Sequence, residues 1–279
     1  MPSDHAMTHH QEGELTVPRI RDKFWIWGQE AGCHTAAEWG VPGPSRMTPA
    51  EGAFYMGIPN VIIVGYGDKP APPFHQYAMP LQPMKNIVWS VVGAGGITDA
   101  AERAEVLKLA KELPNMTGVM MDDFFHDKPG PKGHGVLSLD ELRDLRNGLT
   151  VSGRKLDLWV VIYDRQLTLP VREHLELCDK VTFWSWRAAE LEHLERNFAA
   201  LEKLAPSCGK VLGCYMFDYG THQPMPLDLM EYQCETGLKW LREGRIEAMI
   251  FLATCICDLD LEAVEWSRRW IANLADEAL

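Results

Sequence analysis

Residues 86–113 form one complete strand-and-helix unit, NIVWSVVGAGGITDAAERAEVLKLAKEL. The apolar run at 86–92 lacks alternating polar residues, which is typical of a parallel strand buried on both faces. The glycine-rich stretch GAGG (93–96) predicts a tight loop. Thr98 and Asp99 then start a segment with apolar residues at helical spacing, which ends at Pro114. The stretch therefore predicts a buried strand, a short loop and a covering helix.

The same unit recurs on both sides of this stretch. The apolar runs are FWIWG (24–28), NVIIVGY (60–66), NIVWSVV (86–92), TGVMMDDF (117–124), LDLWVVIYD (156–164), KVTFWSW (180–186), KVLGCYMFD (210–218) and IEAMIFLAT (246–254). Helical patterns are predicted at 48–57, 98–113, 138–149, 169–178, 187–204, 226–244 and 258–274, and a Pro-rich loop at 70–84. Eight alternations of strand and helix predict an α/β fold, a single (β/α)8 barrel. An open, doubly wound sheet is the alternative.

Composition and charge argue against several classes of function. The 279 residues carry 39 acidic and 27 basic side chains, a formal charge of −12, and no basic patch is visible, which argues against a nucleic-acid partner. No apolar stretch is long enough to suggest a membrane span, and the N-terminus has no signal-peptide pattern. Seven cysteines without a paired framework favour the cytoplasm. We expect a flexible lead-in at 1–20 and one catalytic barrel domain at 21–279.

Catalytic side chains of such barrels lie at the carboxyl ends of the strands. Asp122 and Asp123 close the fourth run, and two adjacent buried carboxyl groups would keep one of them protonated. Because successive side chains of a strand alternate in direction, only one of the two should face the barrel axis if the strand stays regular. We expect both near the site, with Asp123 preferred as the acid. The alternative is that one of them only orients a loop or helix.

Three further acids end other runs and are candidate catalytic partners. They are Asp164 at the fifth, Asp218 at the seventh and Glu30 after the first. Glycosidic cleavage needs one carboxyl group to protonate the leaving oxygen and another to attack or to activate water, which fits this supply of acids. As structural alternatives, Asp164 could cap the following helix and Glu30 could form a salt bridge at the rim.

Aromatic and hydrogen-bonding side chains accompany the acids. Flat rings pack on the apolar faces of sugars, and Trp184 and Trp186, two residues apart, share one face of a strand. Packing between barrel and helices is an equally good explanation for one of these two. The candidate substrate-binding residues are Trp27, Gln29, His34, Tyr66, His75, His126, Tyr163, Arg165, Trp184, Trp186, Tyr215 and Tyr219.

Cofactor and metal signals are weak. The GAGG loop before a helix could hold a phosphate, but it is not a dinucleotide fingerprint, and a loop that faces substrate explains it better. Glu30, His34, Asp122 and Asp123 could bind a divalent ion, although no spacing requires it, and Cys255 and Cys257 lack zinc-site spacing. We therefore expect no cofactor and no metal.

The acid pair of the fourth run, the endings IYD and MFDYG, and the many tryptophans resemble (β/α)8 glycoside hydrolases over roughly residues 20–275. In the chitinase-like pattern Gly118 and Asp122 would match, but Phe124 stands where the glutamate belongs, which argues against chitinase chemistry. In the α-galactosidase-type pattern Asp122 or Asp123 would be the nucleophile, and Asp164 or Asp218 would have to supply the acid.

The resemblance implies an enzyme that cleaves a small saccharide or glycoside, with a carbohydrate as its small-molecule partner. A carbohydrate lyase or isomerase, with or without a metal, and a non-catalytic sugar-binding barrel are the alternatives. The oligomeric state stays open.

Overall fold

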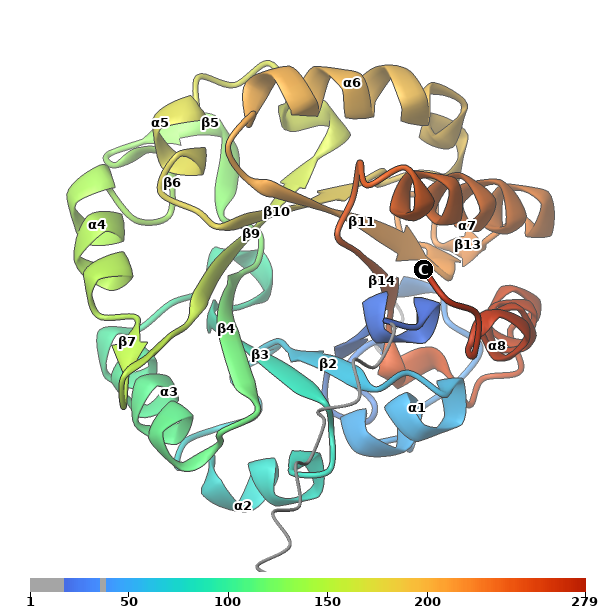
Figure 1. Ribbon diagram of the computed structural model, residues 1–279, viewed down its shortest axis with the longest axis horizontal. Helices are drawn as coiled ribbons and strands as arrows, with labels where there is room; N and C mark the ends of the chain where they lie inside the picture. Colours follow the sequence, from blue (N-terminus) through green and yellow to red (C-terminus); the bar gives the residue numbers. More distant parts are fainter. Residues whose placement is uncertain (1–17, 36–38) are drawn as a thin grey trace, which may run out of the picture.

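The structure is a computed structural model that describes residues 18–35 and 39–279. Eight parallel strands close into a barrel, in the order β1-β14-β11-β10-β9-β4-β3-β2, with helices around it (Figure 1). The barrel strands are β1 (Phe24–Gly28), β2 (Asn60–Ile63), β3 (Asn86–Val92), β4 (Met116–Met121), β9 (Asp157–Tyr163), β10 (Lys180–Trp184), β11 (Gly209–Tyr215) and β14 (Ala248–Leu252). Each predicted apolar run overlaps one of them, so the predicted barrel is confirmed and the open sheet is excluded.

Helices follow the strands in the predicted order, and two of them are only one turn long. They are α1 (Pro49–Met56), α2 (His75–Ala78), α3 (Ala100–Glu112), α4 (Leu139–Asn147), α5 (Arg172–Leu175), α6 (Leu194–Leu204), α7 (Leu227–Arg242) and α8 (Glu262–Leu274). Only α2 and the 3-10 turn η3 (Met79–Leu81) form in the Pro-rich segment 70–84. The pattern at 169–178 gives one turn of helix, because Pro170 has no N–H and confines helix to the residues after it.

Side-chain caps start several helices. Thr48 accepts a hydrogen bond from the Glu51 N–H and Glu51 bonds back, and Ser138 and Glu141 do the same for α4. The carboxylate of Asp99 accepts the N–H groups of the first turn of α3. These contacts satisfy backbone donors that have no partner inside the helix.

Three short antiparallel hairpins extend from the barrel. They are β5 (Phe125–Gly130) with β6 (Gly133–Gly135), β7 (Thr150–Val151) with β8 (Arg154–Lys155), and β12 (Phe217–Asp218) with β13 (Gln223–Pro224). The first hairpin comes directly after the acid pair at the end of β4. It therefore stands beside any site that these acids form.

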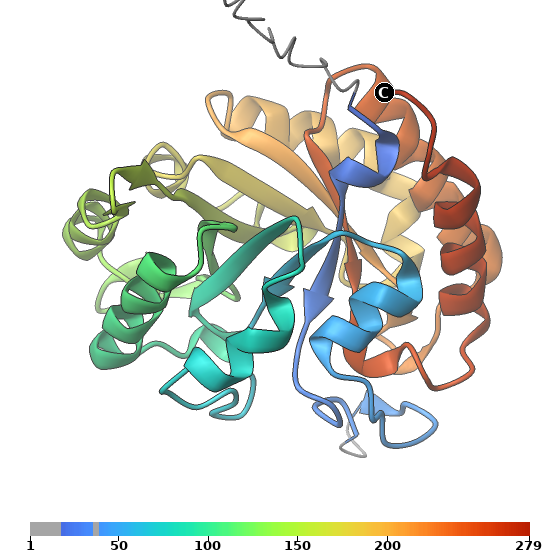
Figure 2. The same ribbon diagram turned by 60° about the horizontal axis from the view of Figure 1, so that its bottom comes forward.

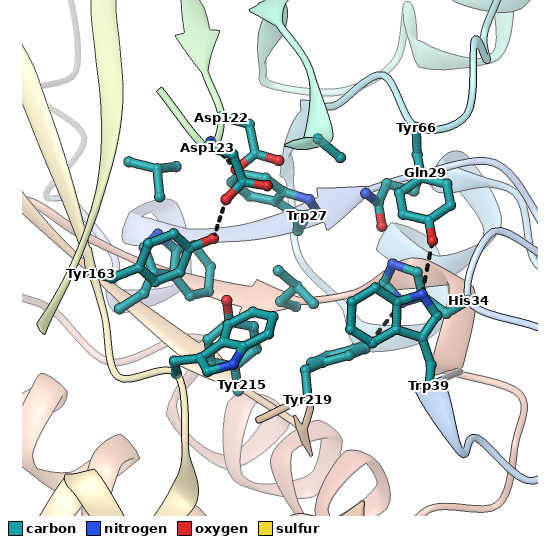
Figure 3. Close-up of a pocket in the computed structure, with 15 residues that line it drawn as sticks. Trp27, Gln29, His34, Trp39, Tyr66, Asp122, Asp123, Tyr163, Tyr215 and Tyr219 are labelled. Carbon is teal, nitrogen blue, oxygen red and sulfur yellow. Dashed lines mark hydrogen bonds between the residues drawn. The ribbon is translucent and has the colours of Figure 1, made fainter. Parts of the chain in front are cut away.

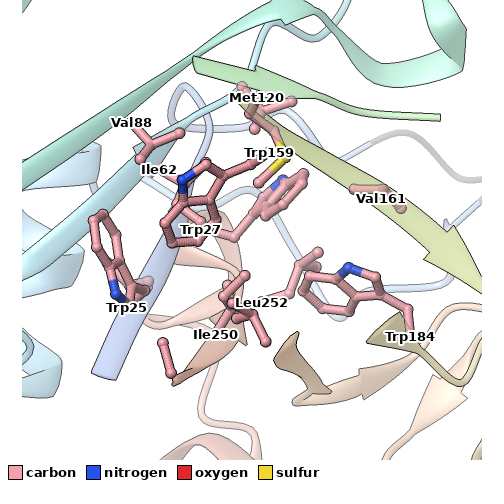
Figure 4. Close-up of a cluster of buried hydrophobic side chains, with 14 of the residues drawn as sticks. Trp25, Trp27, Ile62, Val88, Met120, Trp159, Val161, Trp184, Ile250 and Leu252 are labelled. Carbon is pink, nitrogen blue, oxygen red and sulfur yellow. The ribbon is translucent and has the colours of Figure 1, made fainter. Parts of the chain in front are cut away.

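Tryptophan rings fill the barrel interior (Figure 4). Trp25 contacts Trp159 with ring centroids 5.1 Å apart, and Trp27 contacts Trp184 at 5.4 Å, both edge to face. Glycine makes room for one of these rings, because a Cβ on Gly213 would lie 2.1 Å from the ring of Trp184. Large and small residues on neighbouring strands thus fill the interior without a pore.

The terminal segments meet beside the barrel. Ile20 is fully buried, its N–H donates to the Glu277 carbonyl oxygen, and Arg19 pairs with Asp276 at 2.5 Å. In Figure 2 the arrow of β1 points away from this end and leads into the loop before α1. The predicted lead-in at 1–20 lies outside the described residues up to residue 17. No helix in the described part of the chain is both long and apolar enough to cross a membrane.

Candidate active site

The end of β4 brings both acids into one pocket. Gly118, Met120 and Asp122 alternate toward the barrel interior, so the regular strand places Asp122 inside. Asp123 would point outward, but its φ of 44° takes the chain out of the strand. An aspartate tolerates this left-handed conformation better than most residues do. As a result Asp122 and Asp123 both line the pocket (Figure 3).

The two carboxyl groups have different surroundings. Asp122 is 6% exposed, and burial, together with the nearby charge of Asp123, raises its pKa well above the usual range of an aspartate. One of its oxygens accepts the N–H of Asp123 at 2.9 Å. Asp123 is partly exposed, and its oxygens accept the Tyr163 hydroxyl at 2.7 Å and the Gly95 N–H at 2.8 Å. Burial favours the protonated form of Asp122, whereas Asp123 is partly exposed and accepts two hydrogen bonds.

The GAGG loop holds Asp123. Gly95 and Gly96 have φ values of 69° and 71°, the left-handed region where glycine carries no penalty. The Gly95 N–H is thereby directed at the Asp123 carboxylate. At Gly96 a Cβ would lie 3.0 Å from the Asp123 carbonyl oxygen, so glycine allows the loop to lie this close to Asp123. The loop therefore faces the site, as the sequence analysis expected, through a backbone contact to the acid.

The end of β9 places an aromatic hydroxyl against the acid pair. Tyr163 follows Trp159 and Val161 on the inward face of the strand. Gln166 fixes its backbone by accepting the Tyr163 N–H at 3.0 Å and donating to the Phe125 carbonyl oxygen at 2.7 Å. Burial is the main reason why the pKa of Tyr163 is raised well above 10, so the hydroxyl keeps its proton and donates to Asp123.

Aromatic and hydrogen-bonding groups make the opposite wall. His34 Nδ1 lies 2.7 Å from the Tyr219 hydroxyl, and the Trp39 Nε1–H donates to the Tyr66 hydroxyl at 2.8 Å (Figure 3). His34 is 5% exposed, and burial lowers its pKa to about 4. A neutral imidazole and several hydroxyls can exchange hydrogen bonds with a hydroxyl-bearing ligand without adding charge.

The pocket has the lining of a small-molecule site. Ligand pockets usually have a mainly apolar, aromatic lining with a few polar groups. Its lining residues are Trp27, Gln29, His34, Trp39, Tyr66, Ala94, Asp122, Asp123, Val161, Tyr163, Trp184, Trp186, Tyr215, Tyr219 and Leu252. Nine of the twelve predicted substrate-binding residues line it.

Trp184 and Trp186 both line the pocket but differ in how deeply they are buried. Trp184 is 1% exposed, and its Nε1–H donates to Thr182 at 2.9 Å, so it forms the floor. Trp186 is only partly buried, and its ring lies 5.7 Å from that of Tyr163 and 5.8 Å from that of Tyr215. Trp27 also lines the pocket, whereas Trp25 lies deeper in the barrel.

Three predicted acids do not line the pocket. Asp164 does not line the pocket, and its carboxylate accepts the Arg165 N–H at 2.7 Å. Asp218 is buried but accepts both the N–H and the hydroxyl of Thr221, which makes it a turn-stabilising residue. Glu30 pairs with Lys69 at 3.6 Å, the rim salt bridge that the sequence analysis named as its alternative.

Three predicted substrate-binding residues do not line this pocket. His75 starts α2 and pairs with Glu112 at the end of α3, with 68% of its side chain exposed, so it is remote from the acids. His126 and Arg165 line a second hollow beside the pocket instead. His75 in α2 and His126 in β5 both lie beyond the ends of the barrel strands.

Trp39 is the pocket residue that the sequence analysis missed. It lies in the long loop after β1, beyond the strand-end positions that were searched. Gly40, with φ 69°, lets this loop approach the backbone of His222, since a Cβ would lie 2.8 Å from the His222 carbonyl oxygen. The adjacent Trp-Gly pair in a loop was the available signal. Glu38, next to Trp39, lies outside the described residues.

Comparison with known proteins identifies the fold. No known protein family matches this chain, and no curated protein matches it either. Among solved structures, a chitinase active domain from Pyrococcus furiosus is 10% identical with a TM-score of 0.56, covering 95% of this chain and 100% of that one. A family 18 chitinase from Cycas revoluta is 12% identical with a TM-score of 0.55, covering 88% and 98%.

The chain has the barrel fold of glycoside hydrolases. The fold is not exclusive to them. A protein from Acinetobacter baumannii described as a 2-pyrone-4,6-dicarboxylic acid hydrolase is 8% identical with a TM-score of 0.52, covering 90% of this chain and 91% of that one. Function therefore has to be argued from the site. Within residues 18–35 and 39–279, no three His, Cys, Asp or Glu side chains are grouped to hold a metal ion.

Proposed function

We propose that the protein is a glycoside hydrolase that cleaves a small saccharide or glycoside in the pocket at the end of β4. The observation that carries the proposal is the acid pair, whose members are adjacent in sequence but differ in environment. A buried carboxyl group whose pKa is raised, beside a second carboxyl group, is characteristic of a general acid and its partner. The aromatic walls and neutral hydrogen-bonding groups around the pair suit a sugar ring.

In this mechanism Asp122 is the acid. Its raised pKa favours the protonated carboxyl group, which donates its proton to the glycosidic oxygen as the bond breaks. Asp123, held by its two donors, faces the positive charge that develops on the sugar, or activates water. This assignment reverses the preference in the sequence analysis, because the hydrogen bonds to Asp123 could not be seen there.

The seven cysteines are all free, which supports a reducing compartment. The cytoplasm is accordingly the location that we propose.

A panel of 4-nitrophenyl α- and β-glycosides, together with short oligosaccharides, tests the function directly. On any substrate found, Asp122→Asn should lower kcat by about 10²–10⁴-fold, the usual contribution of a general acid or base. The loss should be smallest for the best leaving group, because nitrophenolate departs with little protonation. Asp123→Asn should impair good and poor leaving groups alike.

The matched control is Asp140→Asn, an exposed acid on α4 that pairs with Arg143. It should leave kcat unchanged. Full activity in both Asp122→Asn and Asp123→Asn would refute the assignment. Saccharide binding without turnover anywhere on the panel would instead favour the sugar-binding barrel.

A further inference from the structure

A second hollow adjoins the pocket on the side of the acid pair. It is lined by Gly95, Asp123, Phe125, His126, Asp127, Tyr163, Arg165 and Trp186. Asp123, Tyr163 and Trp186 line both spaces, so they form the boundary between them. A substrate bond held at Asp123 would have one side in the pocket and the other in the second hollow.

Arg165 is the main polar group of the second hollow. Its guanidinium lies over the ring of Tyr163, 4.3 Å from the centroid, and 6.0 Å from that of Trp186. Its Nε–H donates to Asp127 at 3.4 Å, and its two terminal nitrogens have no hydrogen-bond partner among the described residues. A planar guanidinium stacked on rings presents these free donors along its edge in a fixed direction.

The second hollow carries charges of both signs. Arg165 is cationic, Asp127 and the boundary residue Asp123 are carboxylates, and the ring of His126 adds a further donor or acceptor. An anionic ligand would be repelled by the carboxylates and a cationic one by Arg165. A ligand with several neutral hydroxyls can accept from Arg165 and donate to Asp127 at once.

We propose that the second hollow is a binding subsite for the leaving group of the substrate, a neutral hydroxyl-rich unit such as another sugar residue, and that Arg165 selects it. The subsite rests on the proposed function, because it takes the bond at Asp123 as the one that is cleaved. An enzyme with this subsite prefers saccharides of at least two units to simple aryl glycosides.

Kinetics with two substrates of the same sugar provide the first test. Hydrolysis of a 4-nitrophenyl monoglycoside is compared with that of the neutral disaccharide carrying the same glycone. Arg165→Ala should lower the ratio of kcat/KM for the disaccharide to that for the aryl glycoside at least tenfold, mainly through KM. Arg165→Lys should lie between, since it keeps the charge but loses the planar fork.

The control is Arg143→Ala, an exposed arginine on α4 that pairs only with Asp140 in the described structure, and it should leave the ratio unchanged. A ratio unaffected by Arg165→Ala overturns the subsite while the proposed function stands. A disaccharide carrying a carboxylate on its second unit should be the poorer substrate; a preference for it would overturn the neutral assignment.

Binding supplies a test that needs no turnover. Trp186 borders both spaces, so tryptophan fluorescence can follow titration with neutral mono-, di- and trisaccharides of glucose, N-acetylglucosamine and galactose. For the sugar that binds, affinity should rise at least tenfold from one unit to two, and Arg165→Ala should remove that gain.

A gain in affinity without any hydrolysis supports the subsite and rejects the hydrolase. Hydrolysis without such a gain supports the hydrolase and rejects the subsite. Failure of every saccharide to bind rejects both.

Discussion

Two layers of the barrel interior differ although the same strands build them. On β9, Trp159 lies in the lower layer and Tyr163 at the mouth, and on β4, Met120 is followed two positions later by Asp122. The lower layer consists of interlocking apolar rings, whereas the mouth holds acids and hydroxyls that bond one another (Figures 3 and 4). Two to four residues along a strand thus separate a layer that stabilises the fold from one that is equipped for chemistry.

From this difference between the two layers we expect changes in the lower layer to alter stability and changes at the mouth to alter activity. The largest effect is expected for Gly213→Ala. The added methyl would lie 2.1 Å from the ring of Trp184, which the barrel holds in place. Overpacking of this kind should lower the free energy of unfolding by about 3 kcal/mol, measured in urea.

Gly43→Ala is its control, because a Cβ there meets no atom within 4 Å. It should change the free energy of unfolding by less than about 0.5 kcal/mol. Equal stability of the two variants would show that the ring of Trp184 is not tightly held.

At the mouth, Tyr163→Phe removes the hydroxyl that donates to Asp123. Losing a hydrogen bond to a charged group should reduce kcat about tenfold, equivalent to about 1.4 kcal/mol, on whichever glycoside is turned over. Tyr55→Phe, which removes a hydroxyl bonded to Glu265 on the outer helices, should leave kcat as it is. An unchanged kcat in Tyr163→Phe would mean that Asp123 needs no such donor.

The pH dependence of stability tests the state of Asp122. Its folded pKa is raised, so the native state binds more protons than the unfolded chain above about pH 3.9, the ordinary aspartate value. Its contribution is therefore fully present below that pH and is lost as the pH rises through the folded pKa, with a slope of up to about 1.4 kcal/mol per pH unit.

Asp122→Asn should abolish this component of the slope while preserving the fold, as measured by urea unfolding at several pH values. The same slope in the variant and the wild type would show that Asp122 is not the buried acid. Asp140→Asn, on the exposed face of α4, should retain the wild-type slope.

The smallest effect is expected in the loop that holds Asp123. Gly95→Ala meets no atom within 4 Å, but it forces an L-residue to a φ of 69°. This should cost about 1 kcal/mol in the free energy of unfolding. A loss of stability no larger than that of Gly43→Ala would show that the loop relaxes without strain.

The sequence by itself determined the order of the eight strands, and it indicated that a regular strand would turn only one of Asp122 and Asp123 toward the barrel axis. Apolar runs without alternation predict buried parallel strands, and the two-residue period then assigns each strand's side chains to a face. It also identified most of the pocket, since Tyr163, Tyr215 and Trp184 end or closely follow those runs on the inward face.

Only the tertiary structure decided how the loops turn. The left-handed backbone conformation of Asp123 turns its side chain into the pocket beside that of Asp122. The Thr221 hydroxyl donates a hydrogen bond to the Asp218 carboxylate within one turn. Trp39 reaches the pocket from a loop whose course depends on a close backbone contact at Gly40. Backbone conformation after a strand depends on contacts between distant segments, and a local pattern of residue types does not contain that information.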